Sequence, residues 1–403
     1  MINEKQNLSL QLDLKWQDDL AHYCDRYFLI KTNFWRDSYP AVLDYQIRRA
    51  ELGQVIEVDY KPGDLLSDEF SQNNLKTIPL KKFDQYFKGA MPITPVVGRF
   101  YPRGMIEGVA GCFKMDDRPF RVVGKTEDTL DIDLNHPLAA FPLHLSIIIT
   151  DIFDANQQNG GRCNEVAETI TTQGPGFQCL LKSQSTDFFQ GMPFLRTIED
   201  DDAVFYDAVD SKPPVDQVAI EQLKLFFAHQ LKDNTKILDL MAAPDSYLPE
   251  QFTLLDVTGL GVKESDMQQN PVLNHRVVHD LNRSPKLPFE DHEFDTIICS
   301  FAIEYMTQPQ KVFLELSRIL KPGGKVIISF SEHFYQKKVI ALWEDVHPFE
   351  RMGVVLEYFR QSGQFENLRS ESIRGLIKND DDPFISKNAY SCPLFIISGE
   401  KIK

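Results

Sequence analysis

An acidic side chain closes a short apolar run near the middle of the chain, in the stretch "KILDLMAAPDSYLPE" at residues 236–250. The first five of these residues have the pattern of a buried parallel strand, and Asp239 lies at its end. A carboxylate in this position is typical of an α/β domain that binds a cofactor at the carboxyl ends of its strands. The glycines that usually follow such a strand are absent, so the stretch predicts a cofactor loop of an unusual kind.

More polar residues follow in "HDLNRSPKLPFEDHEFDTIICSFAIEYMTQPQKVFLELSRILKPGGKVIISF", residues 279–330. Within it we expect a strand at 294–301, an amphipathic helix at 308–320 that is stopped by "KPGG", and a strand at 325–330. A further helix is expected over 215–231. Strands that alternate with helices in this way predict a parallel sheet with a ligand site at the carboxyl ends of its strands.

The order of these segments closely resembles the second half of the class I S-adenosylmethionine-dependent methyltransferases. In that family an acid after the third strand is followed by a stretch like "LPFEDHEFDTII" and by a helix that ends like "RILKPGGKVIISF". The resemblance covers roughly residues 216–403. It implies a methyltransferase with an α/β, Rossmann-like sheet of seven strands. The last two strands, near "FENLRSESIRG" and "PLFIISGE", would form an antiparallel hairpin.

The resemblance implies S-adenosylmethionine as the cofactor and accounts for the missing glycines. A glycine-rich turn is needed where backbone amides must reach a pyrophosphate, and this cofactor contains none. In the family the loop after the first strand wraps the methionine part, and Asp239 is placed to bind its ammonium group; alternatively, Asp239 caps the following helix. The cofactor-binding residues that the resemblance implies are Asp239, Leu240, Met241, Ala242, Gly261, Val262, Asp280, Leu281, Asn282 and Phe301.

One position departs from the family pattern. The family usually has an acid at the end of the second strand, where it accepts both ribose hydroxyls, but "LLDVTGLGVKESD" places Gly261 there. Either a neighbour such as Lys263 or Asp266 substitutes, or the nucleoside is held through the backbone and the adenine end. Asp280 occupies the position of the family's adenine-contacting acid. A subgroup of bacterial and chloroplast methyltransferase-like proteins resembles this chain in both the glycine-poor loop and the missing acid.

The predicted catalytic residues are Glu304 and Tyr305, in the segment "SFAIEYM" after the fourth strand. Transfer from a sulfonium group is an in-line displacement, in which alignment of donor and acceptor supplies much of the rate. Glu304 is expected to orient or deprotonate an acceptor and Tyr305 to shape the pocket; alternatively, they are a helix-start acid and a core aromatic. Four later side chains are expected either over the pocket or in the core: Trp343, His347, Tyr358 and Phe359.

The acceptor is expected to be a small molecule. No "NPPY"-like element follows the fourth strand, which disfavours methylation of amides or nucleobases. A site with few ionisable groups fits an acceptor that is itself nucleophilic, such as a thiol or hydrosulfide, so S-methylation is the specific hypothesis.

Composition bounds the remaining possibilities. The chain has 403 residues, enough for two or three domains, and a net charge of −16. This charge disfavours nucleic acid and anionic membrane surfaces as partners. No apolar run reaches the roughly 18–20 residues of a membrane span, and no signal peptide is visible, which favours the cytoplasm. The six cysteines are scattered singly, so no metal site is expected.

The N-terminal half has a different character. Four short, β-branched stretches bounded by turns predict an antiparallel, barrel-like sheet at 53–60, 119–125, 128–134 and 143–153. Residues 16–29, "WQDDLAHYCDRYFL", are expected to be a helical lead. The predicted organisation is a β-rich domain over 1–155, an irregular packing segment over 156–215, and the methyltransferase domain over 216–403.

The phrase "DIDLNHPLAAFPLHLSI" and its surroundings, residues 98–154, resemble the C-terminal part of FKBP-type prolyl isomerases of the SlyD branch. The resemblance implies an FKBP-like domain fused before the methyltransferase domain. Leu145 replaces an aromatic residue of the family's apolar groove, and the metal-binding His-rich tail is missing. We therefore expect a docking or dimerising module with weak isomerase activity or none, whose partner is a peptide or a second copy of the chain.

Two alternative functions follow from the same features. In the first, the protein is a peptide-binding chaperone or prolyl isomerase, and the methyltransferase-like domain is structural. In the second, it is a protein methyltransferase whose FKBP-like module recruits the target.

Overall fold

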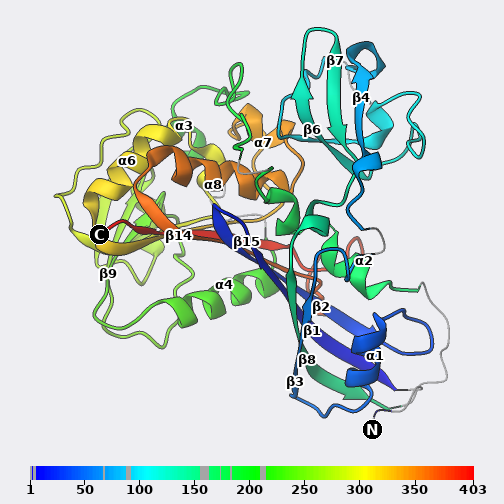
Figure 1. Cartoon of the computed structure of the whole chain (residues 1–403). Coiled ribbons are helices and arrows are strands. Elements are labelled where there is room, and N and C mark those ends of the chain that lie inside the picture. The colour runs from blue at the N-terminus through cyan, green and yellow to red at the C-terminus, as the bar shows by residue number, and fades with distance from the viewer. Residues whose placement is uncertain are drawn as a thin grey trace.

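The computed structural model describes residues 2, 6–66, 69–87, 92–154, 163–172, 174–181, 184–208 and 215–403. Within these ranges the strands form one sheet of eleven strands and one of four (Figure 1). The domain boundaries expected around 154–165 and 210–217 fall largely on residues outside the described ranges.

Seven strands of the large sheet come from the C-terminal half, in the order β11-β10-β9-β12-β13-β15-β14. Their bounds are β9 Lys236–Leu240, β10 Asp256–Gly261, β11 His275–Val278, β12 Phe294–Ser300, β13 Leu320–Phe330, β14 Phe365–Arg374 and β15 Leu394–Lys401. The strands from β11 to β13 pair in parallel, whereas β15 is antiparallel to both β13 and β14. This is the seven-stranded, Rossmann-like arrangement with a terminal hairpin that the sequence predicts.

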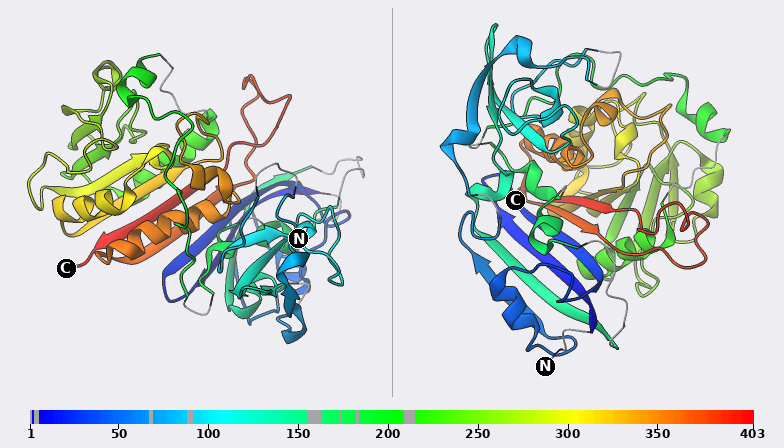
Figure 2. Two further views of the ribbon diagram at one scale, coloured as in Figure 1. Left: turned by 90° about the horizontal axis from the view of Figure 1, so that it is seen from above. Right: turned by 90° about the vertical axis from the view of Figure 1, so that its right-hand side faces the viewer.

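Helices cover both faces of this part of the sheet, which explains why β9 and β12 are apolar almost throughout. The helices are α4 Gln217–Gln230, α5 Glu264–Gln269, α6 Pro309–Ile319, α7 Ala341–Asp345 and α8 Glu350–Ser362. Helices α6 and α8 lie side by side on one face (Figure 2), and α4 lies on the other (Figure 1). The predicted helices over 215–231 and 308–320 correspond to α4 and α6.

The large sheet continues without a break into the N-terminal half. Strand β14 pairs in parallel with β2, and the order then runs β2-β1-β8-β3. The bounds are β1 Asn7–Gln17, β2 Ala21–Thr32, β3 Val55–Tyr60 and β8 Leu143–Phe153, with the short helices α1 Ala41–Ile47 and α2 Val166–Thr171 beside them. Strands that the sequence assigns to two domains therefore share one sheet.

A buried ion pair lies at the β2–β14 junction. The Arg374 guanidinium contacts the Asp25 carboxylate at 2.5 Å, and Asp25 also accepts a hydrogen bond from Ser372. Gly174 packs against this pair, since a Cβ atom at Gly174 would come within 1.9 Å of Asp25 Oδ2. The charge of Asp25 is thus buried but compensated, and the covering segment has no room for a side chain there.

The structure corrects the expectation of a helix over residues 16–29. This stretch forms the end of β1, a tight turn and most of β2. Asp18 makes the turn, because its Oδ1 accepts the backbone N–H groups of Leu20 and Ala21. The two strands then pair in antiparallel register from Gln17 with His22 onward. A capping acid before an apolar run is therefore a hairpin signal here, not a helix start.

The four-stranded sheet lies between β3 and β8 in the sequence. Its order is β4-β7-β6-β5, with bounds β4 Leu75–Pro79, β5 Phe100–Pro102, β6 Pro119–Lys125 and β7 Thr129–Asp133. The predicted N-terminal strands all form, but they divide between two sheets rather than closing one barrel. The small sheet has its own core of Ile78, Phe120, Val122, Leu130 and Ile132.

The small sheet contacts the first turn of α8. Glu350 Oε1 accepts the N–H of Phe100 at 3.0 Å, and the centres of the Phe100 and Phe349 rings lie 5.4 Å apart.

In the part of the chain that the structure describes, no helix is long and apolar enough to cross a membrane.

Candidate cofactor site

A cavity opens at the carboxyl ends of β9, β10, β11 and β12, where the parallel topology predicts a ligand. Eight of the ten predicted cofactor-binding residues line it: Met241, Ala242, Gly261, Val262, Asp280, Leu281, Asn282 and Phe301. The other two, Asp239 and Leu240, are buried in β9 and do not line it.

The loop after β9 reaches the cavity without glycine. Met241 takes a left-handed conformation with φ of 61°, which is the region that glycine usually supplies. Tyr247 and Phe301, which also line the cavity, have φ of 57° and 54°. The Ala242 N–H then donates to Leu260 O at 2.8 Å and closes the loop against β10. Strained residues thus gather at the cavity wall, as they do at many binding sites.

Asp239 stabilises this loop from behind. Its carboxylate accepts a hydrogen bond from Ser246 Oγ at 2.6 Å, and Asn270 Nδ2 donates to the same hydroxyl oxygen at 2.9 Å. Burial raises the pKa of Asp239 to about 7, although the hydrogen bond from Ser246 opposes the rise. The structure places Asp239 in the core beneath the loop, whereas the sequence predicts contact with an ammonium group.

Steric crowding explains why an acid is missing from the end of β10. A Cβ atom at Gly261 would lie 2.5 Å from Ala242 O, closer than a side chain can approach a backbone oxygen. The crowding follows from the glycine-poor loop, because the hydrogen bond of Ala242 to β10 draws that carbonyl over Gly261. The two departures from the family pattern are therefore one structural feature.

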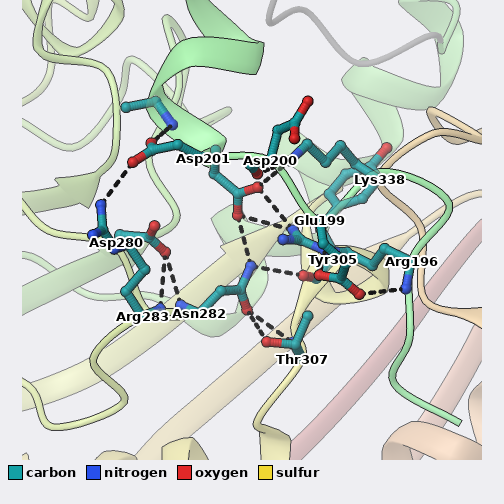
Figure 3. A network of polar contacts seen from close by, with 12 residues as sticks. Arg196, Glu199, Asp200, Asp201, Asp280, Asn282, Arg283, Tyr305, Thr307 and Lys338 are labelled. Carbon is teal, nitrogen blue, oxygen red and sulfur yellow. Dashed lines mark hydrogen bonds and ion pairs between the residues drawn. The ribbon is translucent and has the colours of Figure 1, made fainter. Parts of the chain in front are cut away.

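The loop after β11 presents Asp280 and Asn282 (Figure 3). Asp280 Oδ1 accepts the N–H groups of Asn282 at 2.9 Å and of Arg283 at 3.3 Å, which fixes the carboxylate at the cavity wall. The Asn282 amide donates to Asp202 Oδ2 at 2.8 Å and to Tyr305 O at 3.0 Å, while its Oδ1 accepts from Thr307. Asn282 thus connects three segments around the cavity.

Asp202 begins α3, Asp202–Asp207, and lines the cavity together with Tyr206. Two buried cations hold it: Arg196 Nη1 at 2.8 Å and Lys338 Nζ at 2.7 Å (Figure 3). Burial opposes ionisation, but hydrogen bonds from Lys338, Asn282 and Arg196 outweigh it and keep the pKa of Asp202 below its ordinary value.

This network around Asp202 is not predicted from the sequence. Asp202 stands in the acidic run "EDDD", which is typical of a solvated loop, and its partner Lys338 is 136 residues away. A buried charge in such a run can be recognised only once the distant cation is placed.

The two predicted catalytic residues differ in position. Tyr305 lines the cavity, and its hydroxyl accepts the N–H of Tyr335 at 2.9 Å. Glu304 points away from the cavity and is 2% exposed. Its Oε2 has no hydrogen-bond partner among the described residues, and burial raises its pKa to about 7. Glu304 is therefore a buried acid behind the cavity wall, and Tyr305 is part of the wall.

Aromatic rings form much of the cavity wall. The Tyr247 and Phe301 rings pack edge to face with their centres 5.3 Å apart. The centre of the Tyr305 ring lies 6.4 Å from that of Tyr206 and 6.2 Å from that of Tyr335. Ring faces attract cations and stack on planar groups, so the wall suits a positively charged or aromatic ligand.

Four side chains are expected from the sequence either over the pocket or in the core, and the structure places all of them away from the cofactor cavity. Trp343, Tyr358 and Phe359 are fully buried in the core, and the His347 ring lies tilted against the Phe349 ring with their centres 4.1 Å apart. These four side chains do not line the cofactor cavity.

A protein-family model described as "Methyltransferase domain" matches residues 240–328, from the loop after β9 to near the end of β13. The C-terminal half contains a class I methyltransferase domain. The match includes the predicted cofactor-binding residues that line the cavity, from Met241 to Phe301.

Relatives of this methyltransferase domain are named for different acceptors. A demethylmenaquinone methyltransferase of Paenarthrobacter aurescens (strain TC1) is 28% identical over 158 residues, which cover 38% of this chain and 59% of that protein. A malonyl-[acyl-carrier protein] O-methyltransferase of Marinomonas sp. (strain MWYL1) is 28% identical over 152 residues, covering 32% and 54%. The chain thus spans little more than half the length of these relatives.

Among solved structures, an S-adenosylmethionine-dependent methyltransferase from Aquifex aeolicus matches 50% of this chain and all of its own, with 17% identity and a TM-score of 0.33.

Proposed function

We propose that this protein transfers a methyl group from S-adenosylmethionine to a small acceptor. The observation that carries the proposal is the cavity at the carboxyl ends of β9 to β12, most of whose lining residues belong to the segment matched by the methyltransferase family model and which is lined by eight predicted cofactor residues.

The donor set of the cavity fits this cofactor. The oriented Asp280 carboxylate can accept hydrogen bonds from the adenine amino group, and the side chains of Val262 and Leu281 offer apolar contact to the adenine ring. The loop at Met241 and Ala242 can take the methionine part. When bound, S-adenosylmethionine would supply a methyl group on a sulfonium sulfur, which an acceptor atom would take by in-line displacement with S-adenosylhomocysteine as the leaving group. The aromatic wall around Tyr305 suits that cation.

The ionisable groups at the cavity favour an acceptor that brings its own nucleophile. Asp202 is neutralised by Arg196 and Lys338, and Asp266 pairs with Lys263. Burial raises the pKa of the Tyr305 hydroxyl, so it stays protonated and can donate a hydrogen bond but cannot act as a base. A thiolate or hydrosulfide needs no base near neutral pH. We therefore propose S-methylation, with Tyr305 shaping the acceptor side.

A second candidate acceptor is the ring carbon of a quinol. Two relatives support it: the Paenarthrobacter protein is named for demethylmenaquinone, and one from Psychromonas ingrahamii is named for ubiquinone and menaquinone C-methylation. A planar ring would also stack on the aromatic wall formed by Tyr206, Tyr305 and Tyr335.

Calorimetry with S-adenosylhomocysteine tests cofactor binding. We expect one site per chain, and at least about tenfold weaker binding by Asp280→Asn, because a charged acceptor is lost. Glu290→Gln, an exposed acid between β11 and β12, is the matched control and should bind like the wild type. If millimolar ligand gives no heat of binding, the methyltransferase proposal fails.

Product analysis separates the two acceptors. The protein and cofactor are incubated in parallel with hydrosulfide, a small thiol and a demethylated naphthoquinol. Methanethiol or a methyl thioether supports S-methylation, and a C-methylated ring supports the second candidate. A further incubation uses cofactor with a radiolabelled methyl group and a cell extract. Label that appears only on protein from the extract would contradict both acceptors and support protein methylation.

For the N-terminal half we propose an FKBP-like docking module with little isomerase activity. The support is the packing of α1 against four antiparallel strands, together with a small sheet inserted between β3 and β8. A proline-peptide isomerisation assay on the full chain tests this proposal, and turnover comparable to an active isomerase would overturn it in favour of the chaperone alternative.

A further inference from the structure

We infer that Asp266, paired with Lys263, takes the place of the missing acid and accepts hydrogen bonds from the ribose hydroxyls of the cofactor. The inference rests on the proposed function and concerns the same cavity. It assigns the nucleoside contact to a carboxylate on α5 rather than to the end of β10.

The end of β10, where the family usually has this acid, cannot supply an acidic side chain in this protein. A side chain at residue 261 is excluded by Ala242 O, which lies 2.5 Å from where its Cβ would stand. A ribose approaching the end of β10 therefore meets backbone, and its hydroxyl groups require an acceptor from a neighbouring segment.

Asp266 supplies that acceptor at the right place. It follows Gly261 by five residues, in the first turn of α5, and it lines the cavity along with Gly261, Val262 and Lys263. The residue is only 5% exposed, so its carboxyl group is largely removed from bulk water. An acid buried in the wall of a ligand cavity, away from bulk water, needs polar partners there.

Lys263 accounts for part of this need. Its Nζ lies 3.1 Å from Asp266 Oδ1 and donates to Tyr206 O at 3.0 Å, so the lysine is held between α5 and α3. Among the residues that the structure describes, Lys263 is the one ion-pair partner of Asp266. A carboxylate offers about four lone-pair sites, and those not used by the lysine can accept the two ribose hydroxyls.

The other acids around the cavity are already committed. Asp202 is bound by Arg196, Lys338 and Asn282. Asp280 is bound by the backbone at the end of β11, where it suits the adenine end. Glu264 is in the same helix as Asp266 but is exposed and outside the cavity wall.

The test compares binding of S-adenosylhomocysteine with binding of its 2′-deoxy and 3′-deoxy analogues by calorimetry. In the wild type we expect removal of a hydroxyl to weaken binding roughly 10- to 100-fold, the range for hydrogen bonds to a charged acceptor. In Asp266→Ala the ratio of the dissociation constants of the deoxy analogue and of S-adenosylhomocysteine should fall to about one. Asp266→Asn, which keeps the volume, should give an intermediate ratio.

Glu264→Gln is the matched control, because it removes the same charge from the same helix and should keep the wild-type ratio. Thermal unfolding of each variant establishes that it is folded. If Asp266→Asn and Asp266→Ala are folded and still discriminate against the deoxy analogues as the wild type does, the hydroxyls are recognised elsewhere and the inference is wrong. If the wild type does not bind S-adenosylhomocysteine at all, the proposed function itself fails, and this inference falls with it.

Discussion

Lys338 Nζ lies 2.7 Å from Asp202 Oδ1, and the lysine side chain is completely buried. The same ammonium group donates to Asp200 O and lies 5.1 Å from the centre of the Phe205 ring. This one side chain, from the segment after β13, therefore anchors the start of α3 over the cofactor cavity (Figure 3).

We predict that Lys338→Met lowers the free energy of unfolding by about 3 kcal/mol, because it leaves a buried carboxylate with one cation fewer. Urea unfolding measures the loss, and limited proteolysis near residues 196–208 should accelerate. Lys337→Met is the matched control: this neighbour is exposed, and its loss should change the stability by less than about 0.5 kcal/mol. Equal effects of the two substitutions would contradict the anchoring role.

Two buried acids should make the protein less stable as the pH rises. Burial raises the pKa of Asp239 and of Glu304 to about 7, whereas unfolded carboxyls titrate near pH 4. The folded state holds the protons more tightly, so their contribution is complete below about pH 4 and is lost as the pH rises through 7.

Asp239→Asn and Glu304→Gln have no such proton to lose. Between pH 4.5 and pH 8, the free energy of unfolding should fall less in each variant than in the wild type. The difference should reach up to about 3 kcal/mol in urea unfolding. Glu290→Gln, at an exposed acid, should follow the wild-type profile. Parallel profiles for all four proteins would mean that neither acid is protonated in the folded state at neutral pH.

Met241 offers a direct test of strain in the cofactor loop. A non-glycine residue at φ of 61° costs roughly 1 kcal/mol, and a β-branched residue costs more. Met241→Gly should therefore remain within about 1 kcal/mol of the wild type, because relief of strain offsets the lost packing. Met241→Val should be clearly less stable in thermal unfolding. If valine is tolerated as well as glycine, the left-handed conformation is not enforced.

Gly261→Ala should disrupt the cavity, although alanine is the smallest possible side chain. Its Cβ would meet Ala242 O at 2.5 Å, so the loop after β9 must move away from β10. We expect at least tenfold weaker binding of S-adenosylhomocysteine in calorimetry, with a smaller change in stability. Unchanged binding would show that the loop can retreat freely, and the steric reason for the missing acid would then be wrong.

The shared sheet predicts that its two halves do not separate cleanly. A fragment of residues 215–403 would expose the edge of β14, including Ser372, which is buried and bonded to Asp25 of β2 in the full chain. Exposed strand edges pair with one another, so the fragment should aggregate in light-scattering measurements. Placing a charge there with Ser372→Lys, at a side chain whose partner Asp25 is absent from the fragment, should reduce the aggregation. A monomeric, soluble fragment without that substitution would contradict the prediction.

The sequence was most informative where the determining interactions are local. The helix at α6 and the strand at β12 were predictable, because hydrophobic periodicity and the "KPGG" stop are contained in the segments themselves. Eight of the predicted cofactor-binding residues line the cavity and could be carried over from the family pattern for the same reason: each stands within a few residues of a strand end.

Interactions between distant segments were not accessible in this way. The pairing of β14 with β2 and the contact of Lys338 with Asp202 depend on the whole topology. The helix predicted over residues 16–29 failed because an acid before an apolar run caps either a helix or a hairpin turn, and the choice depends on whether a partner strand is present.

The β2–β14 junction also has a consequence for synthesis. Asp25 and Ser372 meet there across 347 residues of sequence. At roughly 5–20 residues per second, β2 is made about 20–70 seconds before the strand that covers its edge leaves the ribosome. During that interval the nascent N-terminal sheet carries an open strand edge, which can pair with other strands until β14 covers it.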